Sequence, residues 1–182
     1  RPHFVEIDVH ASRDGELVVI HDASLQRTSN GKGAVSDLSL TELRRLDIGQ
    51  GERIPLLSEV LDLAAGRATV NIELKGKGVA IPTADLLRRR LAASEQAAEE
   101  FLASSLNESN LILFAEQLPQ IRIAPVADRP QERTWALARR LDAWSVHVAK
   151  AAVNQRLIDE AQRQNRKLLV YTVNDPEEVE QL

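Results

Sequence analysis

Strand-like and helix-like segments alternate regularly from residue 69 onward, and this alternation restricts the fold more than any other feature of the sequence. The strand-like segments are short and apolar, whereas the segments between them have apolar residues at helical spacing. The predicted strands are 69–74, 101–106, 121–126, 143–148 and 167–173, and the predicted helices are 83–93, 109–117, 130–140, 154–164 and one that begins near 175. Such an alternation produces parallel βαβ units, so the sequence predicts an α/β fold.

The amino-terminal part of the chain differs from this pattern. Residues 4–9 read as a strand, Asp14-Gly15 is a strong signal for a tight turn, and residues 17–20 read as a second strand. We therefore expect a β-hairpin extension near residues 10–22. The loop-rich region that follows has two helical signals, a capping box at Ser39 and Glu42 and a helix over 57–65.

Two architectures accommodate these elements. A TIM (β/α)8 barrel needs about 250 residues, and the 182 residues here are short of that by roughly two βα units of about 30 residues each. A doubly wound open sheet would need no further units, but no Gly-rich dinucleotide loop is present. No linker divides the chain, so we expect 1–182 to be a single domain. If that domain is a barrel, its first and last βα units lie outside this sequence, and it is incomplete at both ends.

Composition excludes several classes of protein. The formal net charge is −4 and the basic residues are scattered, so a nucleic-acid partner is not expected. The chain has no cysteine, which excludes disulfides, thiolate catalysis and cysteine-based zinc sites. No apolar run approaches the roughly 20 residues that a membrane-spanning helix needs. The sequence favours a cytoplasmic location and leaves a periplasmic or secreted one open.

Two acidic residues on the first predicted strand are candidate metal ligands. Glu6 and Asp8 are two positions apart, so their carboxylates project from the same face of the strand. On a face that points into a barrel, an unpaired charge is costly and a cation would compensate it. Oxygen ligands favour a hard ion such as Ca²⁺ or Mg²⁺. A solvent-facing strand edge would show the same pair, so the pair alone leaves both interpretations open.

The same spacing recurs at the end of the next barrel strand. Glu73 could supply a third carboxylate, and Lys75 lies on the same face, where it could offset the acids or bind a phosphate oxygen. Taken alone, such a pair is more often a surface ion pair that contributes little free energy.

Histidines supply the remaining candidates. His21 ends the second strand of the hairpin, which folds it back toward Glu6 and Asp8. An imidazole that titrates near neutrality suits general acid/base catalysis, although a lone histidine at a strand end is more often structural. His147 shares a strand face with Ser145 and is expected either to contact substrate at the barrel mouth or to be structural. A metal that neutralises phosphate and an imidazole that moves protons together describe phosphoester hydrolysis.

The order of these motifs resembles the glycerophosphodiester phosphodiesterase family over nearly the whole chain. The matching residues are Glu6-Ile7-Asp8-Val9, Asp14-Gly15, Val18-Val19-Ile20-His21-Asp22, Leu25, Arg27-Thr28-Ser29-Asn30-Gly31, Gly33, Asp37, Leu40, Glu42-Leu43, Ile54-Pro55, Leu57, Asn71-Ile72-Glu73-Leu74-Lys75, Ser104-Ser105 and Tyr171-Thr172-Val173-Asn174-Asp175. Each match is weak alone, but the ordered series is improbable by chance.

The resemblance implies a TIM barrel that hydrolyses small glycerophosphodiesters, such as glycerophosphocholine, to sn-glycerol 3-phosphate and an alcohol. It implies one divalent cation, Ca²⁺ or Mg²⁺, and two histidines that relay protons, one of them His21. The substrate's own glycerol hydroxyl is a candidate for the first attack on phosphorus. Lys75 would lie near the phosphate, and Tyr171 in the wall of the substrate pocket. The implied metal ligands are Glu6, Asp8 and Glu73.

The sequence departs from the family at three places. The family's first strand ends in a His-Arg-Gly motif, which supplies the other histidine and a phosphate-binding arginine, and neither His3 nor His10 is followed by Arg-Gly. The family's last strand, usually Gly-Val-Asp-Gly followed by Thr-Asp, has no counterpart up to Leu182. These two gaps match the deficit of two βα units. Tyr171 stands where the family more often has Trp, which alters the wall of the substrate pocket.

Two other functions fit parts of this pattern. A sphingomyelinase-type phospholipase could use the same barrel, but such enzymes usually have disulfides and an apolar loop at the lipid interface, and this chain has no cysteine. A catalytically inactive barrel that only binds a ligand would lack the His-Arg-Gly motif in its complete sequence.

Overall fold

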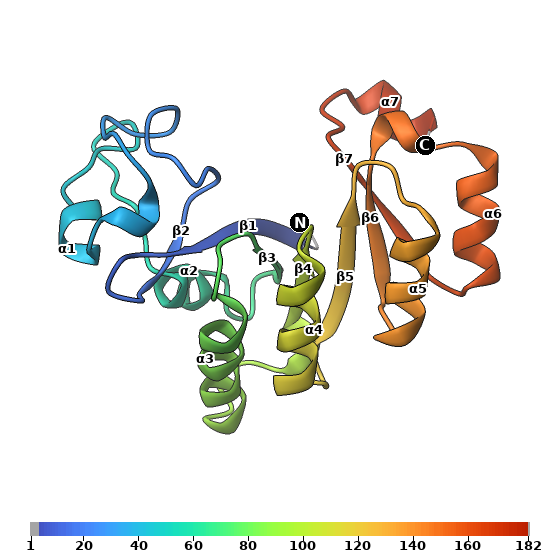
Figure 1. Cartoon of the computed structure of the whole chain (residues 1–182), viewed down its shortest axis with the longest axis horizontal. Helices are drawn as coiled ribbons and strands as arrows, with labels where there is room; N and C mark the ends of the chain where they lie inside the picture. Colours follow the sequence, from blue (N-terminus) through green and yellow to red (C-terminus); the bar gives the residue numbers. More distant parts are fainter. Residues whose placement is uncertain (1–3, 182) are drawn as a thin grey trace. The chain divides into compact units, whose positions relative to one another are not determined.

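A computed structural model of the chain describes residues 4–181, and the chain divides into two compact units, Arg1–Arg122 and Ile123–Leu182. Figure 1 shows the strands and helices of both units in sequence colours. Within each unit, parallel strands are joined through helices, which confirms the predicted α/β class. Among the described residues, no helix is both long enough and apolar enough to cross a bilayer.

The strands of the first unit lie in the order β2-β1-β3-β4. They are β1 (Phe4–Ala11), β2 (Leu17–Val19), β3 (Thr69–Leu74) and β4 (Phe101–Ser105). β2 pairs antiparallel with β1, and β3 and β4 are added in parallel. The predicted hairpin is therefore confirmed. Gly15 at its turn has a φ of 85°, a conformation that glycine adopts without steric cost.

Helices follow the strands of this unit. They are α1 (Leu40–Leu43), α2 (Leu57–Ala64), α3 (Ala80–Ala92) and α4 (Glu108–Gln117), with 3₁₀ turns at Val35–Asp37 and Ala98–Glu100. The predicted capping box is present at the start of α1, where the Glu42 carboxylate accepts a hydrogen bond from the Ser39 N–H. α3 begins earlier than the predicted residue 83, because Pro82 lies in its first turn, where backbone N–H groups have no helical acceptor.

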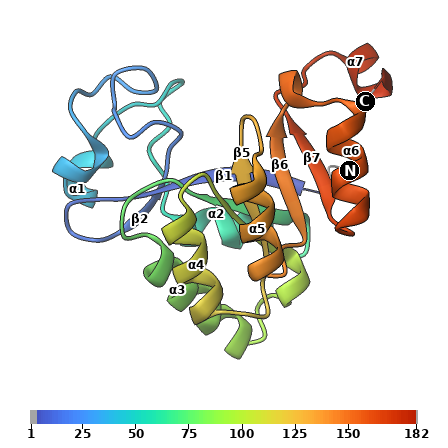
Figure 2. The same ribbon diagram turned by 45° about the vertical axis from the view of Figure 1, so that its right-hand side comes forward.

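Residues 17–56, which we call the arm, have a small core of their own. The arm is the blue and cyan region around α1, and it extends away from α3 and α4 in both Figure 1 and Figure 2. Its buried apolar side chains are Val18, Ile20, Leu25, Val35, Leu43 and Ile54. A backbone hydrogen bond of 3.1 Å from Ile20 N–H to the carbonyl of Asp8 ties the arm to β1. The arm core therefore fixes the path of the chain at the next residue, His21.

The second unit repeats the βα pattern. Its strands are β5 (Arg122–Ala127), β6 (Ser145–Ala149) and β7 (Lys167–Tyr171), and its helices are α5 (Glu132–Arg140), α6 (Gln155–Arg163) and α7 (Pro176–Gln181), with a 3₁₀ turn at Lys150–Ala152. The three strands are parallel, with β6 paired to both β5 and β7. Residues 145–148 of β6 are all buried, so side chains on both faces of this strand are covered.

Candidate active site

The strand register brings three carboxylates together on one face of β1 and β3. Asp8 is paired with Glu73 in the parallel ladder, and Glu6 precedes Asp8 by two residues on the same face. One carboxylate oxygen from each residue lies within 4.8 Å of the others. The structure therefore brings the three predicted metal ligands together. Their binding of a metal remains a prediction.

This acid cluster, Glu6, Asp8 and Glu73, is short of hydrogen-bond donors. Although Glu6 as a residue is exposed, partial desolvation of its carboxylate and the nearby Asp8 and Glu73 charges raise its pKa to about 7. Burial also raises the pKa of Glu73, against the opposing effect of the Lys75 ammonium. The Oε1 atom of Glu73 is buried without a hydrogen-bond partner. Three carboxylates with an unpaired buried oxygen fit a hard divalent cation.

Lys75 lies between the acid cluster and His21. Its Nζ is 2.9 Å from Asp8 Oδ1 and 3.2 Å from His21 Nε2. The same ammonium group donates to the backbone carbonyl of His21 at 3.4 Å. The predicted proximity of Lys75 to the acids is found in the structure, and these contacts also link the cluster to the candidate proton-transfer group.

On the Nδ1 side of its ring, His21 is held by two residues for which no role was predicted. Its Nδ1 is 2.5 Å from Asp22 Oδ1, and Arg27 donates to both Asp22 oxygens, from Nε at 2.6 Å and from Nη2 at 2.7 Å. These hydrogen bonds, first from Arg27 and then from His21, hold the pKa of Asp22 well below its usual range. Arg27 Nη2 is also 2.9 Å from His21 Nδ1. Nδ1 thus faces Asp22, which can only accept, and Arg27, which can only donate. In the tautomer with the proton on Nδ1, His21 donates to Asp22 and presents the lone pair of Nε2 toward Lys75.

A close backbone approach places Lys75 beside the cluster. The loop after β3 passes against β1, and the Gly76 N–H donates to the carbonyl of Val9 at 3.0 Å. A Cβ atom at Gly76 would lie only 3.0 Å from the Cα of His10, so any larger residue would push the two segments apart. Gly76 thus permits the approach that carries the preceding lysine to Asp8.

Two buried polar side chains hold the end of β3. Asn110, on α4, donates to the carbonyls of Leu74 and Gly76 at 2.9 and 3.0 Å, and the Ser105 hydroxyl donates to the Leu74 carbonyl at 2.7 Å. These bonds bracket Lys75 on both sides. The role of Asn110 was not predicted from the sequence. This residue lies in the first turn of α4, three residues after the N-cap Asn107, where polar residues are common, so its type gave no signal for the contact.

The other histidines near the first strand do not form the missing motif. His10 is buried in β1, where its ring forms a hydrogen bond with the backbone of His21. Burial lowers the pKa of His10. Its Nε2 is buried without a hydrogen-bond partner. His3 lies outside the described residues. His10 therefore supports the backbone at His21, while no Arg-Gly follows it in the sequence.

The two remaining predicted residues belong to the second unit. His147 is buried in β6, where its Nε2 lies 3.2 Å from the Ser145 hydroxyl, and burial lowers its pKa to about 4. Tyr171, at the end of β7, donates a hydrogen bond of 2.8 Å to Asp128, just after β5. The contact of either residue with substrate remains a prediction.

Comparison with known proteins places this arrangement in a family. The sequence profile described as the glycerophosphoryl diester phosphodiesterase family matches residues 3–182. The chain belongs to this family. A glycerophosphodiester phosphodiesterase of Caldanaerobacter subterraneus is 32% identical over 98% of this chain and 76% of that protein, and one of Bacillus altitudinis is 29% identical over 98% of this chain and 77% of that protein. The resemblance and the enzyme class predicted from the sequence, a phosphoric diester hydrolase, are confirmed.

Solved structures confirm the predicted barrel class. A phosphodiesterase from Oleispira antarctica, in complex with the product sn-glycerol 3-phosphate, matches with a TM-score of 0.82 and 28% identity, over 94% of this chain and 73% of that one. A glycerophosphodiester phosphodiesterase from Agrobacterium tumefaciens matches with a TM-score of 0.79 and 26% identity, over 98% of this chain and 78% of that one. The α/β fold of this family member is therefore that of the TIM barrel.

Proposed function

We propose that the chain hydrolyses small glycerophosphodiesters to sn-glycerol 3-phosphate and an alcohol, with the acid cluster as its divalent-cation site and His21 as a proton-transfer group. Membership of the family and the product bound to the Oleispira relative support the substrate class. One observation carries the proposal. Three carboxylates converge within 4.8 Å, and Lys75 bridges them to the Nε2 of His21.

The donor set of the acid cluster favours Ca²⁺ or Mg²⁺ over softer ions. The candidate ligands are carboxylate oxygens alone, and one of them, Glu73 Oε1, is buried and unpaired. Desolvation first, and then the charges of Asp8 and Glu73, raise the pKa of Glu6, so its ionised form is disfavoured when no cation compensates the cluster. A divalent cation held there would neutralise charge that develops on the phosphate.

The side chains around the cluster divide the remaining work. In the overall hydrolysis, the oxygen of a water molecule forms a bond to phosphorus and loses a proton, while the bond from phosphorus to the leaving alcohol breaks and the leaving oxygen gains a proton. Nε2 of neutral His21 can accept the first proton, and the ionised Asp22, 2.5 Å from Nδ1, stabilises the imidazolium that forms. His21 can then return the proton to the leaving oxygen. Lys75, 2.9 Å from Asp8, is placed to donate to a phosphate oxygen.

Release of sn-glycerol 3-phosphate from glycerophosphocholine tests this function. We expect a chelator to abolish release and added Ca²⁺ or Mg²⁺ to restore it. His21→Ala should lower kcat by roughly 10²–10⁴-fold, the usual contribution of a general acid or base. Gln26→Ala, an exposed side chain in the same segment of the arm, is the matched control and should retain activity. Release that survives both chelation and the loss of His21 would refute the proposal.

A further inference from the structure

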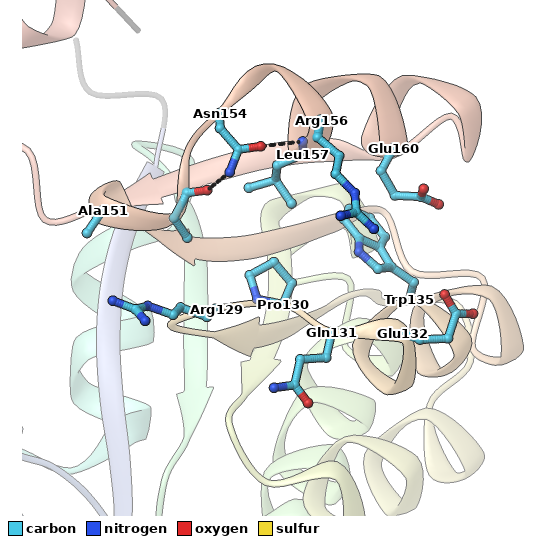
Figure 3. Close-up of a pocket in the computed structure, with 11 residues that line it drawn as sticks. Arg129, Pro130, Gln131, Glu132, Trp135, Ala151, Asn154, Arg156, Leu157 and Glu160 are labelled. Carbon is cyan, nitrogen blue, oxygen red and sulfur yellow. Dashed lines mark hydrogen bonds between the residues drawn. The ribbon is translucent and has the colours of Figure 1, made fainter.

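A pocket of about 470 Å³ lies in the second unit, between the amino-terminal ends of α5 and α6 (Figure 3). Its walls come from the loop after β5, the first turns of both helices, and the 3₁₀ turn after β6. This volume lies within the usual range of small-molecule sites. The pocket contains none of the residues assigned to catalysis above.

Two arginines line this pocket without a compensating acid. Arg129 follows β5 and Arg156 lies in the first turn of α6, and both side chains are exposed. Within residues 4–181, neither guanidinium group has a hydrogen bond or an ion pair. Figure 3 shows the Arg156 side chain lying over the Trp135 indole, whereas Arg129 is directed away from both at the opposite edge of the pocket. Arg156 therefore offers its N–H donors beside the indole, and Arg129 adds positive charge at the rim.

A buried tryptophan adds a third donor. Trp135, on α5, is 4% exposed, and Figure 3 shows its indole directed from the helix into the pocket. Among the described residues, its ring N–H has no hydrogen-bond partner. The N–H opens to the pocket and is not enclosed by protein atoms, so a group that enters the pocket and accepts a hydrogen bond could reach it.

The acids of the pocket are already neutralised by other residues. Glu132 accepts a hydrogen bond from Arg139 at 2.6 Å, and Glu160 is paired with Arg163 and bonded by Gln164. Hydrogen bonds from Gln164 and Arg163 lower the pKa of Glu160, so that carboxylate is already compensated. Each of these two carboxylates is therefore paired with residues of its own helix or with the residue that ends it.

The capping side chain of α6 faces its own backbone. Asn154 accepts a hydrogen bond from the Leu157 N–H at 3.0 Å and donates one to the Ala152 carbonyl at 3.1 Å, both drawn in Figure 3. The amide oxygen is thus occupied by the helix. The pocket consequently presents donors and positive charge.

We propose that this pocket of the second unit binds the oxyanion group of a small phosphorylated or carboxylated molecule. The Arg156 guanidinium and the Trp135 indole N–H supply the donors, Arg129 adds positive charge at the rim, and Pro130 and Leu157 supply an apolar wall for a short organic part of the ligand. Charge-assisted bidentate bonds from arginine suit phosphate and carboxylate alike. The chemistry of the pocket thus defines an anionic ligand and leaves phosphate and carboxylate as the two sources to compare.

The indole N–H of Trp135 offers a direct test by NMR of the full chain labelled with ¹⁵N. The two tryptophan resonances are assigned with Trp135→Phe, and inorganic phosphate and then acetate are titrated at constant ionic strength. We expect the Trp135 resonance to shift saturably and the Trp144 resonance to stay in place. The ion that saturates at the lower concentration identifies the oxyanion class.

Matched variants separate a built site from general charge. Arg156→Ala should weaken binding by about tenfold or more, the loss expected for hydrogen bonds to a charged group, and Arg129→Ala, which removes only a charge at the rim, should weaken it less. Arg133→Ala removes the same charge from an exposed position on α5 outside the pocket and should leave binding unchanged. Arg156→Lys, which keeps the charge but loses the fork, should be intermediate and guards against misfolding of the alanine variants.

Several results would overturn the proposal. Equal shifts of both tryptophan resonances, or the same shifts with chloride, would indicate a general ionic effect. Equal weakening in Arg133→Ala would assign the response to net charge. The absence of any saturable Trp135 shift in the unaltered chain, up to tens of millimolar of either ion, would also reject the site.

Discussion

The two units carry opposite deficits at the ends of their parallel strands. In the first unit, the acid cluster gathers acceptors without enough donors, which raises the pKa of Glu6 and leaves Glu73 Oε1 unpaired. In the second unit, the pocket between α5 and α6 is lined by Arg129, Arg156 and Trp135, whose donors have no partner among the described residues, while its two acids are paired with other arginines. The same βα framework thus carries the proposed cation site in one unit and the proposed anion site in the other. Unpaired acceptors indicate a cation as the ligand and unpaired donors indicate an anion, whereas the fold alone indicates neither.

Replacing Glu73 by Gln tests this contrast with the largest expected effect. The amide keeps the size of the side chain but removes a charge from the acid cluster, so Ca²⁺ affinity should fall, and kcat/KM should drop on the order of 10³-fold if the cation supplies several kcal/mol. Calorimetric titration with Ca²⁺ and release of sn-glycerol 3-phosphate measure the two effects. The phosphate response of the Trp135 resonance should be unchanged.

Glu116→Gln is the matched control for this variant. Glu116 is exposed on α4 in the same unit and lies outside the acid cluster. It should bind Ca²⁺ and release product as the unaltered chain does. If Glu73→Gln retained full Ca²⁺ affinity, the cluster would not be the cation site. If the variant also lost the Trp135 response, the two sites would not be independent.

The buried histidine of the second unit should make stability depend on pH. Burial holds the pKa of His147 at about 4, below the ordinary value of 6.5, so the folded chain keeps it neutral while the unfolded chain binds a proton. Its contribution is therefore fully present above pH 6.5 and is lost as the pH falls toward 4, by up to about 3 kcal/mol. Urea unfolding at pH 7 and pH 4.5 measures this loss. His147→Gln should remove it.

Ser145→Ala provides the control for the His147 prediction. Ser145 contacts His147 Nε2 at 3.2 Å, and alanine removes that contact but leaves a buried imidazole to titrate. The loss of stability at low pH should persist in this variant. An equal loss in His147→Gln and the unaltered chain would mean that the imidazole does not resist protonation in the folded state.

Much of the acid cluster was predictable because it follows from two periodicities. Alternation along a strand places Glu6 and Asp8 on one face, and parallel pairing sets Glu73 beside Asp8. Likewise, the capping box at Ser39 predicts the start of α1 without any tertiary information. These features depend on neighbours in the sequence or on the repeat of the fold.

The remaining features depend on contacts between distant segments. The hydrogen bonds from Arg27 to Asp22 form because packing of the arm core bends the loop that carries both residues. No rule based on residue spacing predicts that bend. Asn110 reaches the carbonyls of Leu74 and Gly76 from another element. The pocket is the hardest of these features to predict from the sequence, because Arg129 and Arg156 resemble ordinary solvated side chains. Only the folded chain brings the starts of α5 and α6 side by side.

The smallest predicted effect concerns Glu6, whose pH dependence should run opposite to that of His147. Its pKa is raised from 4.5 to about 7, first by desolvation and then by Asp8 and Glu73, so the folded chain holds a proton that the unfolded chain releases. The metal-free chain should therefore lose stability as the pH rises from 4.5 through 7. Since Glu6 is exposed, solvent screens the charge, and Glu6→Gln should raise the unfolding temperature at pH 8 by only about 1–3 °C.

Thermal unfolding with a chelator at pH 4 and pH 8 measures this effect. At pH 4 the two chains should unfold at the same temperature, since Glu6 is then protonated in both the folded and the unfolded state. Saturating Ca²⁺ should reverse the order at pH 8, because a bound cation stabilises the unaltered chain more than a variant with one carboxylate fewer. A metal-free variant less stable than the unaltered chain at pH 8 would mean that the Glu6 carboxylate is already compensated. In that case the acid cluster would not need a cation to compensate its charge, and the first unit would not differ from the second in the way proposed.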